Sequence, residues 1–124
     1  MTTNNPIDLE ILAKLQELDD ENNSFVIELF TLYLNNIPPN IQKIKESFSN
    51  GKFQEVSKVA HQMKSSSGNI GAMYISKLCS TLEDFDMSKD TKGAEALIQS
   101  IEAAFTAVRD CYENKIFPSL QKKK

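Results

Sequence analysis

Several residue types on which protein sites are commonly built are scarce in this chain. Its 124 residues include one histidine, two cysteines, four glycines, four prolines and no tryptophan. One imidazole cannot provide the two Glu-x-x-His motifs of a di-iron helical bundle, so we expect no metal site and no cofactor. Cys79 and Cys111 lie in apolar helical patterns without CxxC spacing, which predicts buried, reduced thiols.

Charge and hydropathy argue against two further classes of partner. The net charge is -3 and no basic face stands out, which argues against nucleic-acid binding. The basic end, Gln121 to Lys124, is expected to be a frayed, solvated tail. No run approaches the ~18 apolar residues of a membrane span, and Met1 to Asp8 lack the regions of a secretion signal. We expect a cytoplasmic protein, also nuclear in a eukaryote, that does not bind membranes.

The composition and the hydrophobic period predict helices throughout the chain. Leu, Ile, Glu, Lys, Gln and Ala are abundant, and apolar residues recur at helical spacing over about 8–18, 25–48, 52–67, 75–85 and 94–112. No segment shows the alternating period of a strand. We predict one domain over residues 1–124, an all-α antiparallel bundle with frayed tails at about 1–5 and 119–124.

Caps and prolines set the local expectations. Asn23 or Ser24 is expected to cap the second helix with its side chain. The pair Pro38-Pro39 interrupts the pattern of that helix, so we expect a kink or a short break near Asn36. Pro118 is expected to end the extension of the last helix.

The one histidine is His61, and the helical wheel places it outside the core. The apolar stripe of its helix centres between Val56 and Met63, and His61 lies roughly 140° from that centre. Its neighbours on the same face are small: Ser57, Ser65 and Gly68. The imidazole should therefore stand clear, with room for another protein to approach. An exposed histidine without a role is the alternative.

Lys64 follows His61 by three positions, so its ammonium can reach the same region of the surface. A phosphoryl group carries about -1.5 to -2 charges near neutral pH, and a lysine one turn away lowers the energetic cost of that charge. Phosphoryl transfer mostly needs positioning and charge stabilisation, so a histidine beside a lysine is chemically sufficient. An ordinary solvated lysine is the alternative.

The segment around His61 resembles the motif of the histidine-containing phosphotransfer (HPt) domain, approximately A-H-x-L-K-G-S-S-x-x-x-G-A. The matching residues are Ala60, His61, Lys64, Ser66, Ser67, Gly71 and Ala72. Met63 replaces leucine, and Ser65 replaces glycine, which is the main departure. Leu15 to Asp20 and Phe25 to Leu29 are similar to the opening of stand-alone plant and yeast HPt proteins.

The resemblance implies a four-helix bundle with a shorter N-terminal helix lying across it. It also implies a relay, in which Nε2 of His61 accepts a phosphoryl group from a receiver-domain aspartate and passes it to another receiver, with Lys64 stabilising the phosphate. The implied partners are response-regulator receiver domains, which supply magnesium and catalytic carboxylates, and a hybrid sensor histidine kinase. The chain itself is expected to be a monomeric carrier. It is not expected to be a kinase, because it has no nucleotide-binding glycine-rich loop.

The implied docking surface combines the small residues beside His61 with apolar residues of two other helices. The residues expected to contact the partner are Ser57, Ser65, Gly68, Ile11, Leu15 and Leu32. Leu32 is the most informative, because it lies off the apolar stripe of its helix. Two alternatives stay open. The apolar residues simply hold the short helix to the bundle, or the chain is an adaptor that binds receivers or kinases without carrying phosphate.

Overall fold

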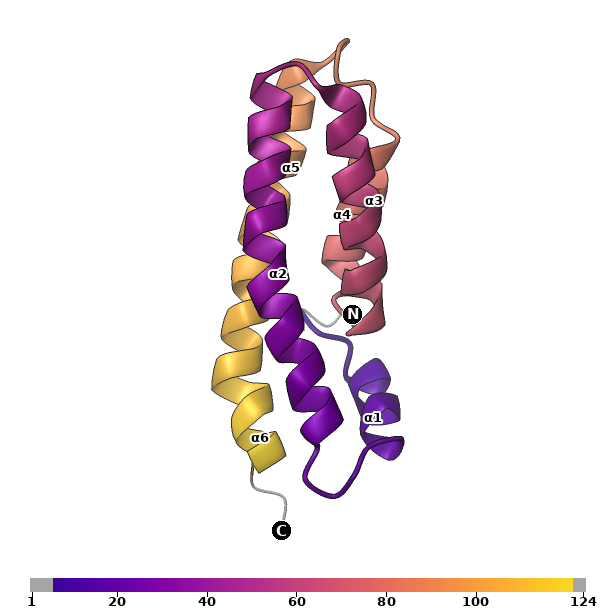
Figure 1. Cartoon of the computed structure of the whole chain (residues 1–124), viewed down its shortest axis with the longest axis vertical. Coiled ribbons are helices and arrows are strands. Elements are labelled where there is room, and N and C mark those ends of the chain that lie inside the picture. Colours follow the sequence, from indigo (N-terminus) through magenta and orange to yellow (C-terminus); the bar gives the residue numbers. More distant parts are fainter. Residues whose placement is uncertain (1–5, 122–124) are drawn as a thin grey trace, which may run out of the picture.

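The computed structural model describes residues 6–121, and this part of the chain is all-α (Figure 1). The elements in chain order are α1 (Leu9–Glu17), α2 (Ser24–Ser49), α3 (Phe53–Asn69), α4 (Met73–Glu83), α5 (Thr91–Cys111), a π-helical turn η1 (Tyr112–Ile116) and α6 (Phe117–Gln121). Between residues 6 and 121 there is no strand. The predicted fold class is confirmed.

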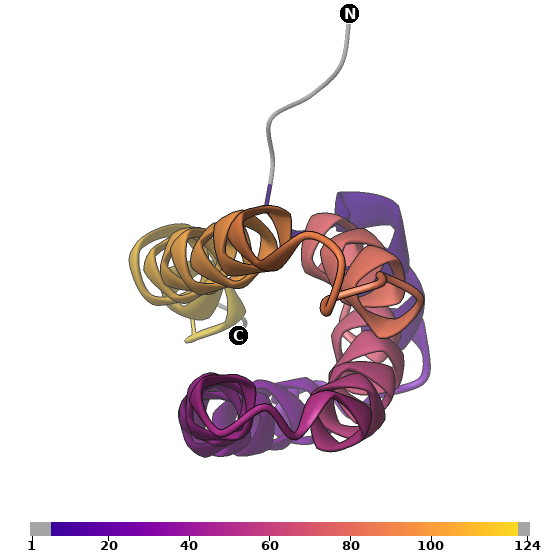
Figure 2. The same ribbon diagram turned by 90° about the horizontal axis from the view of Figure 1, so that it is seen from above.

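Helices α2 to α5 surround one core. α3 packs against α2 and α4, and α5 packs against α4 and α2, so that the four helices close into a bundle when viewed end-on (Figure 2). All four contribute large, fully buried side chains, among them Phe30, Ile44, Met63, Leu82 and Ile101. Within the described range, no helix is both long enough and apolar enough to cross a membrane.

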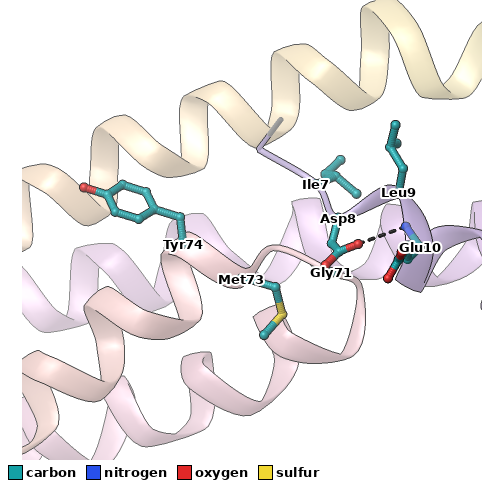
Figure 3. Close-up of a pocket in the computed structure, with 7 residues that line it drawn as sticks. All are labelled: Ile7, Asp8, Leu9, Glu10, Gly71, Met73 and Tyr74. Carbon is teal, nitrogen blue, oxygen red and sulfur yellow. Dashed lines mark hydrogen bonds between the residues drawn. The ribbon is translucent and has the colours of Figure 1, made fainter. Parts of the chain in front are cut away.

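The short helix α1 lies beyond the turn between α3 and α4, beside the N-terminal half of α2 (Figure 1). Asp8 caps it by accepting hydrogen bonds from the N–H groups of Glu10 and Ile11. The Asp8 N–H donates to the Gly71 carbonyl at 2.7 Å, and Ile7 is fully buried. Figure 3 shows these three residues and the hydrogen bond from the Glu10 N–H to the Asp8 carboxylate. A Cβ at Gly71, where φ is +87°, would lie 3.1 Å from the Asp8 carbonyl oxygen, so this turn requires glycine.

The kink or short break predicted at Pro38-Pro39 is present as a bend, and the prediction that Pro118 ends the last helix is not met. α2 bends in Figure 1 but continues without a break through Pro38 and Pro39. Both prolines are exposed while Ile37 and Ile41 stay buried, so the carbonyl groups left without a donor can face water. The expectation that Pro118 ends the last helix is wrong. Pro118 lies in the first turn of α6, directly after the π-helical turn η1. The N–H groups of a first turn have no partner within their own helix, so the missing donor of a proline costs little there.

Two expectations at the chain's helix ends need correction. Neither Asn23 nor Ser24 caps α2 with its side chain, because the Asp19 carboxylate accepts from the N–H groups of the first turn. The Asn23 amide instead donates to the Leu120 carbonyl at 3.3 Å. Leu120 is buried, so residues 119–121 are helical and not frayed. The remaining parts of the predicted tails, 1–5 and 122–124, lie outside the described residues.

Candidate functional site

His61 lies in the middle of α3 and faces away from the core. Its side chain is 58% exposed, whereas Ala60 and Met63 are fully buried. This exposure agrees with the helical wheel and excludes a core histidine. The orientation is fixed by the apolar stripe, because turning α3 to bury His61 would bring Val56 and Met63 into water.

A carboxylate from α4 holds the imidazole ring. Nδ1 of His61 lies 2.8 Å from Oε2 of Glu83, and Nζ of Lys64 lies 2.9 Å from Oε1. The hydrogen bond from Lys64, supported by the one from His61, holds the pKa of Glu83 below its usual range. The carboxylate is therefore ionised and can only accept hydrogen bonds. In the neutral imidazole, Nδ1 must carry the proton and Nε2 keeps the lone pair.

The α3–α4 hairpin brings Glu83 level with His61. Residues at similar distances from the turn of an antiparallel helix pair lie close together. Gly71 is midway between the end of α3 and the start of α4, and it lies ten residues after His61 and twelve before Glu83. The Ser57 hydroxyl donates to the Glu83 carbonyl at 2.9 Å, and the Ser76 hydroxyl donates to the Lys64 carbonyl at 3.0 Å. These bonds tie α3 to α4 on both sides of the site, so the main chain that carries Glu83 is held as well as its side chain.

Glu83 is the residue of this site that the sequence analysis missed. Neighbours of His61 along its own helix cannot reveal it, because it lies on the next helix. The predicted antiparallel order of the segments 52–67 and 75–85 indicates only the region of the second helix that lies near His61. Counting from the middle of the turn between them reaches Thr81, two residues before Glu83. Lys64 does reach the predicted region of the surface, and it does so through Glu83.

The three small residues predicted beside His61 lie in different surroundings. Ser65 is exposed. Gly68 is half-buried, and a Cβ there would meet only the Ser76 hydroxyl at 3.6 Å, which is an ordinary contact, so the fold does not require glycine. Ser57 is also half-buried, and its hydroxyl is bonded to α4. It therefore has a structural role beside Glu83, which the sequence did not indicate.

The three apolar residues of the predicted docking surface also differ. Leu32 is 52% exposed and lines a hollow between α2 and α3 together with Gln62 and Ser66, which are neighbours of His61 along α3. Ile11 and Leu15 are half-buried. Leu15 packs against the core and Ile11 lies close to the α3–α4 turn. Both residues therefore help to hold α1 to the bundle.

Comparison with known proteins identifies the family. The model of the Hpt domain matches residues 28–111, more than half of the chain. This chain belongs to the Hpt domain family. It is 28% identical over 108 residues to histidine-containing phosphotransfer protein 4 of Arabidopsis thaliana, with 85% of each chain covered. It is 26% identical over 101 residues to histidine-containing phosphotransfer protein 2 of the same plant, covering 79% of this chain and 64% of that protein.

The Hpt fold also has a counterpart among solved structures. The crystal structure of histidine-containing phosphotransfer protein B from Pseudomonas aeruginosa matches with a TM-score of 0.80 at 24% identity, covering 98% of this chain and 100% of that one. As an Hpt protein, the chain is a phosphorelay intermediate of two-component signalling. Members of this family are phosphoryl carriers and not classical enzymes, and they interact with receiver domains and kinases.

Proposed function

We propose that His61 is the residue of this Hpt protein that carries the phosphoryl group, and that Nε2 is the atom to which phosphorus is bonded. The observation that supports this assignment is the 2.8 Å hydrogen bond between Nδ1 and Glu83. It engages one ring nitrogen and leaves the lone pair of Nε2 available on an exposed side chain. His61 is also the one histidine of the chain.

The proposed transfer keeps the ring proton in place. The lone pair of Nε2 attacks phosphorus in a receiver aspartyl phosphate, the bond from phosphorus to the aspartate oxygen breaks, and its electron pair leaves with the receiver's carboxylate. The phosphorylated ring, still protonated at Nδ1, is positively charged. The Glu83 carboxylate stabilises this charge through its hydrogen bond. Transfer to a second receiver reverses the steps and regenerates neutral His61.

In this proposal Lys64 stabilises the phosphate by compensating Glu83. Without the ammonium at 2.9 Å, an incoming phosphoryl group would approach an unpaired carboxylate and be repelled. The receiver supplies magnesium and catalytic carboxylates. This chain then needs to supply only a nucleophile, positive charge and a docking surface, because phosphoryl transfer depends mainly on positioning and electrostatics.

We further propose how the partner docks and where the relay operates. Response-regulator receivers and a hybrid sensor kinase cover the face around His61, and the residues proposed to contact them are Ser65, Gly68 and Leu32 at the centre with Ser57, Ile11 and Leu15 at the edge. The chain acts as a monomer in the cytoplasm, and also in the nucleus of a eukaryotic cell. Burial raises the pKa of the Cys79 thiol to about 12, which suits a compartment where cysteines stay reduced.

Phosphotransfer from a receiver tests the assignment of His61. Receiver domains from the same genome, phosphorylated with acetyl phosphate, are incubated with wild type, His61→Gln and Gln99→Ala, an exposed change on α5. Wild type and Gln99→Ala should take up acid-labile phosphate from a cognate receiver, and His61→Gln should take up none. Equal labelling of His61→Gln overturns the assignment. Receiver binding without labelling of wild type supports the adaptor hypothesis instead.

A further inference from the structure

The charges beside His61 are already paired before a phosphoryl group arrives. Lys64 and Glu83 lie 2.9 Å apart, so they neutralise one another while the imidazole is neutral. A phosphoryl group adds a charge of about -1.5 to -2. Because the Lys64 ammonium is shared with Glu83, the phosphorylated site needs a further cation.

Lys58 is a cation in a suitable position. It precedes His61 on α3 by three residues, as Lys64 follows by three, so the two lysines flank the imidazole at roughly 60° to either side around the helix. Lys58 is exposed and forms no salt bridge with any residue of the described range. In this it differs from Lys43, Lys45 and Lys64, which each pair with a glutamate.

The opposite flank of His61 is acidic, which makes the position of Lys58 more significant. Asp84 directly follows Glu83 at the end of α4. Asp86 lines the same hollow as Ser57, on the side of α3 that faces α4. An incoming phosphoryl group is therefore repelled from that flank and attracted to the flank that carries Lys58.

We propose that Lys58 is a phosphate-binding residue of this site, whose ammonium donates hydrogen bonds to the phosphoryl oxygens during transfer and in phosphorylated His61. The inference rests on the proposed role of His61. It adds no covalent step, and the ammonium keeps its protons. Lys64 compensates Glu83, and Lys58 compensates the phosphoryl group itself.

Titration of the phosphoryl group tests this proposal directly. Wild type, Lys58→Gln, Lys58→Arg and Lys92→Gln are phosphorylated with phosphoramidate, and the phosphohistidine signal is followed by ³¹P NMR against pH at low salt. A nearby ammonium favours the dianion, so Lys58→Gln should raise the pKa of the phosphoryl group. Lys58→Arg should stay close to wild type. Lys92, an exposed lysine at the start of α5, is the matched control and should have no effect.

The transfer rate from a phosphorylated receiver provides a second measurement. Lys58→Gln should accept phosphate roughly three- to tenfold more slowly at low salt, with the difference shrinking at high salt. If the phosphoryl group of Lys58→Gln has the same pKa as that of wild type, the proposal is overturned. Slower transfer without a shifted pKa overturns it too, because that result assigns Lys58 to receiver docking alone. Phosphate on His61→Gln, or none on wild-type histidine, contradicts the role of His61 and is a separate outcome.

Discussion

The two ends of the α3–α4 pair are built in opposite ways. At the turn, α1 is attached through a main-chain hydrogen bond of 2.7 Å between Asp8 and Gly71, and the neighbouring Ile7 is fully buried. At the far end of α4, beside the middle of α3, the Glu83 side chain bonds to both His61 and Lys64 at the surface, and His61 is more than half exposed. The turn is packed for stability, whereas the far end of α4 holds the exposed side chain that we propose as the nucleophile.

One short segment, residues 60–72, supplies both ends. His61 and Ser65 face solvent, whereas Ser67 is fully buried and its hydroxyl forms a 2.7 Å hydrogen bond with the Tyr33 hydroxyl inside the core. Gly71 shapes the turn. Residues that belong to one motif therefore serve different purposes, and substitutions should separate into those that alter stability and those that alter phosphotransfer.

Gly71→Ala should have the largest effect, and it should act on stability. The alanine Cβ would lie 3.1 Å from a main-chain oxygen at a φ of +87°, and we expect the free energy of unfolding to fall by about 2–3 kcal/mol. Gly51→Ala is the matched control, because φ is +73° there but nothing lies within 4 Å. Urea unfolding should show the smaller loss for Gly51→Ala. If both variants lose the same free energy of unfolding, the close contact between Gly71 and α1 contributes nothing to the loss.

Glu83→Gln should act on transfer and leave the fold intact. The amide accepts a weaker hydrogen bond from Nδ1 and leaves Lys64 without its ion pair, so we expect phosphate uptake from a receiver to slow by about tenfold. Glu95→Gln, the same change at an exposed position on α5, is the control and should transfer at the wild-type rate. A Glu83→Gln variant with an unchanged rate would show that the carboxylate does not activate the ring.

Gly68→Ala should separate stability from docking. The new Cβ meets only Ser76 at 3.6 Å, and alanine is the better helix former, so the free energy of unfolding should rise by about 0.5–1 kcal/mol. If Gly68 leaves space for a partner, receiver binding should weaken at the same time. Calorimetric titration with a receiver domain measures this. Unchanged binding would remove Gly68 from the docking surface.

The smallest expected effect is the pH dependence of the Glu83 contact. Its pKa is lowered in the folded protein by Lys64 and His61, so its contribution to stability is present above the ordinary glutamate pKa. That contribution is lost as pH falls through the lowered value. The difference in unfolding free energy between wild type and Glu83→Gln should therefore be smaller at pH 3 than at pH 7. A difference that does not change with pH would contradict an ionised Glu83 in the site.

Periodicity alone predicted most of the fold, because each long helix buries one continuous apolar stripe. The same pattern placed His61 outside the core. Errors arose where one residue was judged without its surroundings. Pro118 lies in the first turn of α6, where a proline is tolerated, although within a helix it is disruptive. The sequence predicts a frayed tail at Leu120 because the contact of this residue with Asn23, at the start of α2, is distant in sequence.

The site was predicted less completely than the fold, for a related reason. His61 and Lys64 share one helix, where spacing fixes their relation. Glu83 and Ser57 act across the hairpin, and their contacts depend on the register of α3 against α4. Spacing along one helix carries no information about that register. Glu83, which determines the nitrogen of His61 that is protonated, could therefore be identified only from the structure.

The central claim is that the Glu83 carboxylate, by accepting a hydrogen bond, holds the imidazole proton on Nδ1 and leaves Nε2 to take the phosphoryl group. Because the chain has one histidine, a long-range ¹H–¹⁵N spectrum of ¹⁵N-labelled protein contains a single imidazole, recorded before and after phosphorylation by a receiver. The account predicts a proton on Nδ1 and a free lone pair on Nε2 beforehand, and phosphorus coupled to Nε2 afterwards. Phosphorus coupled to Nδ1, or an imidazole spectrum unchanged while the protein carries phosphate, would contradict it.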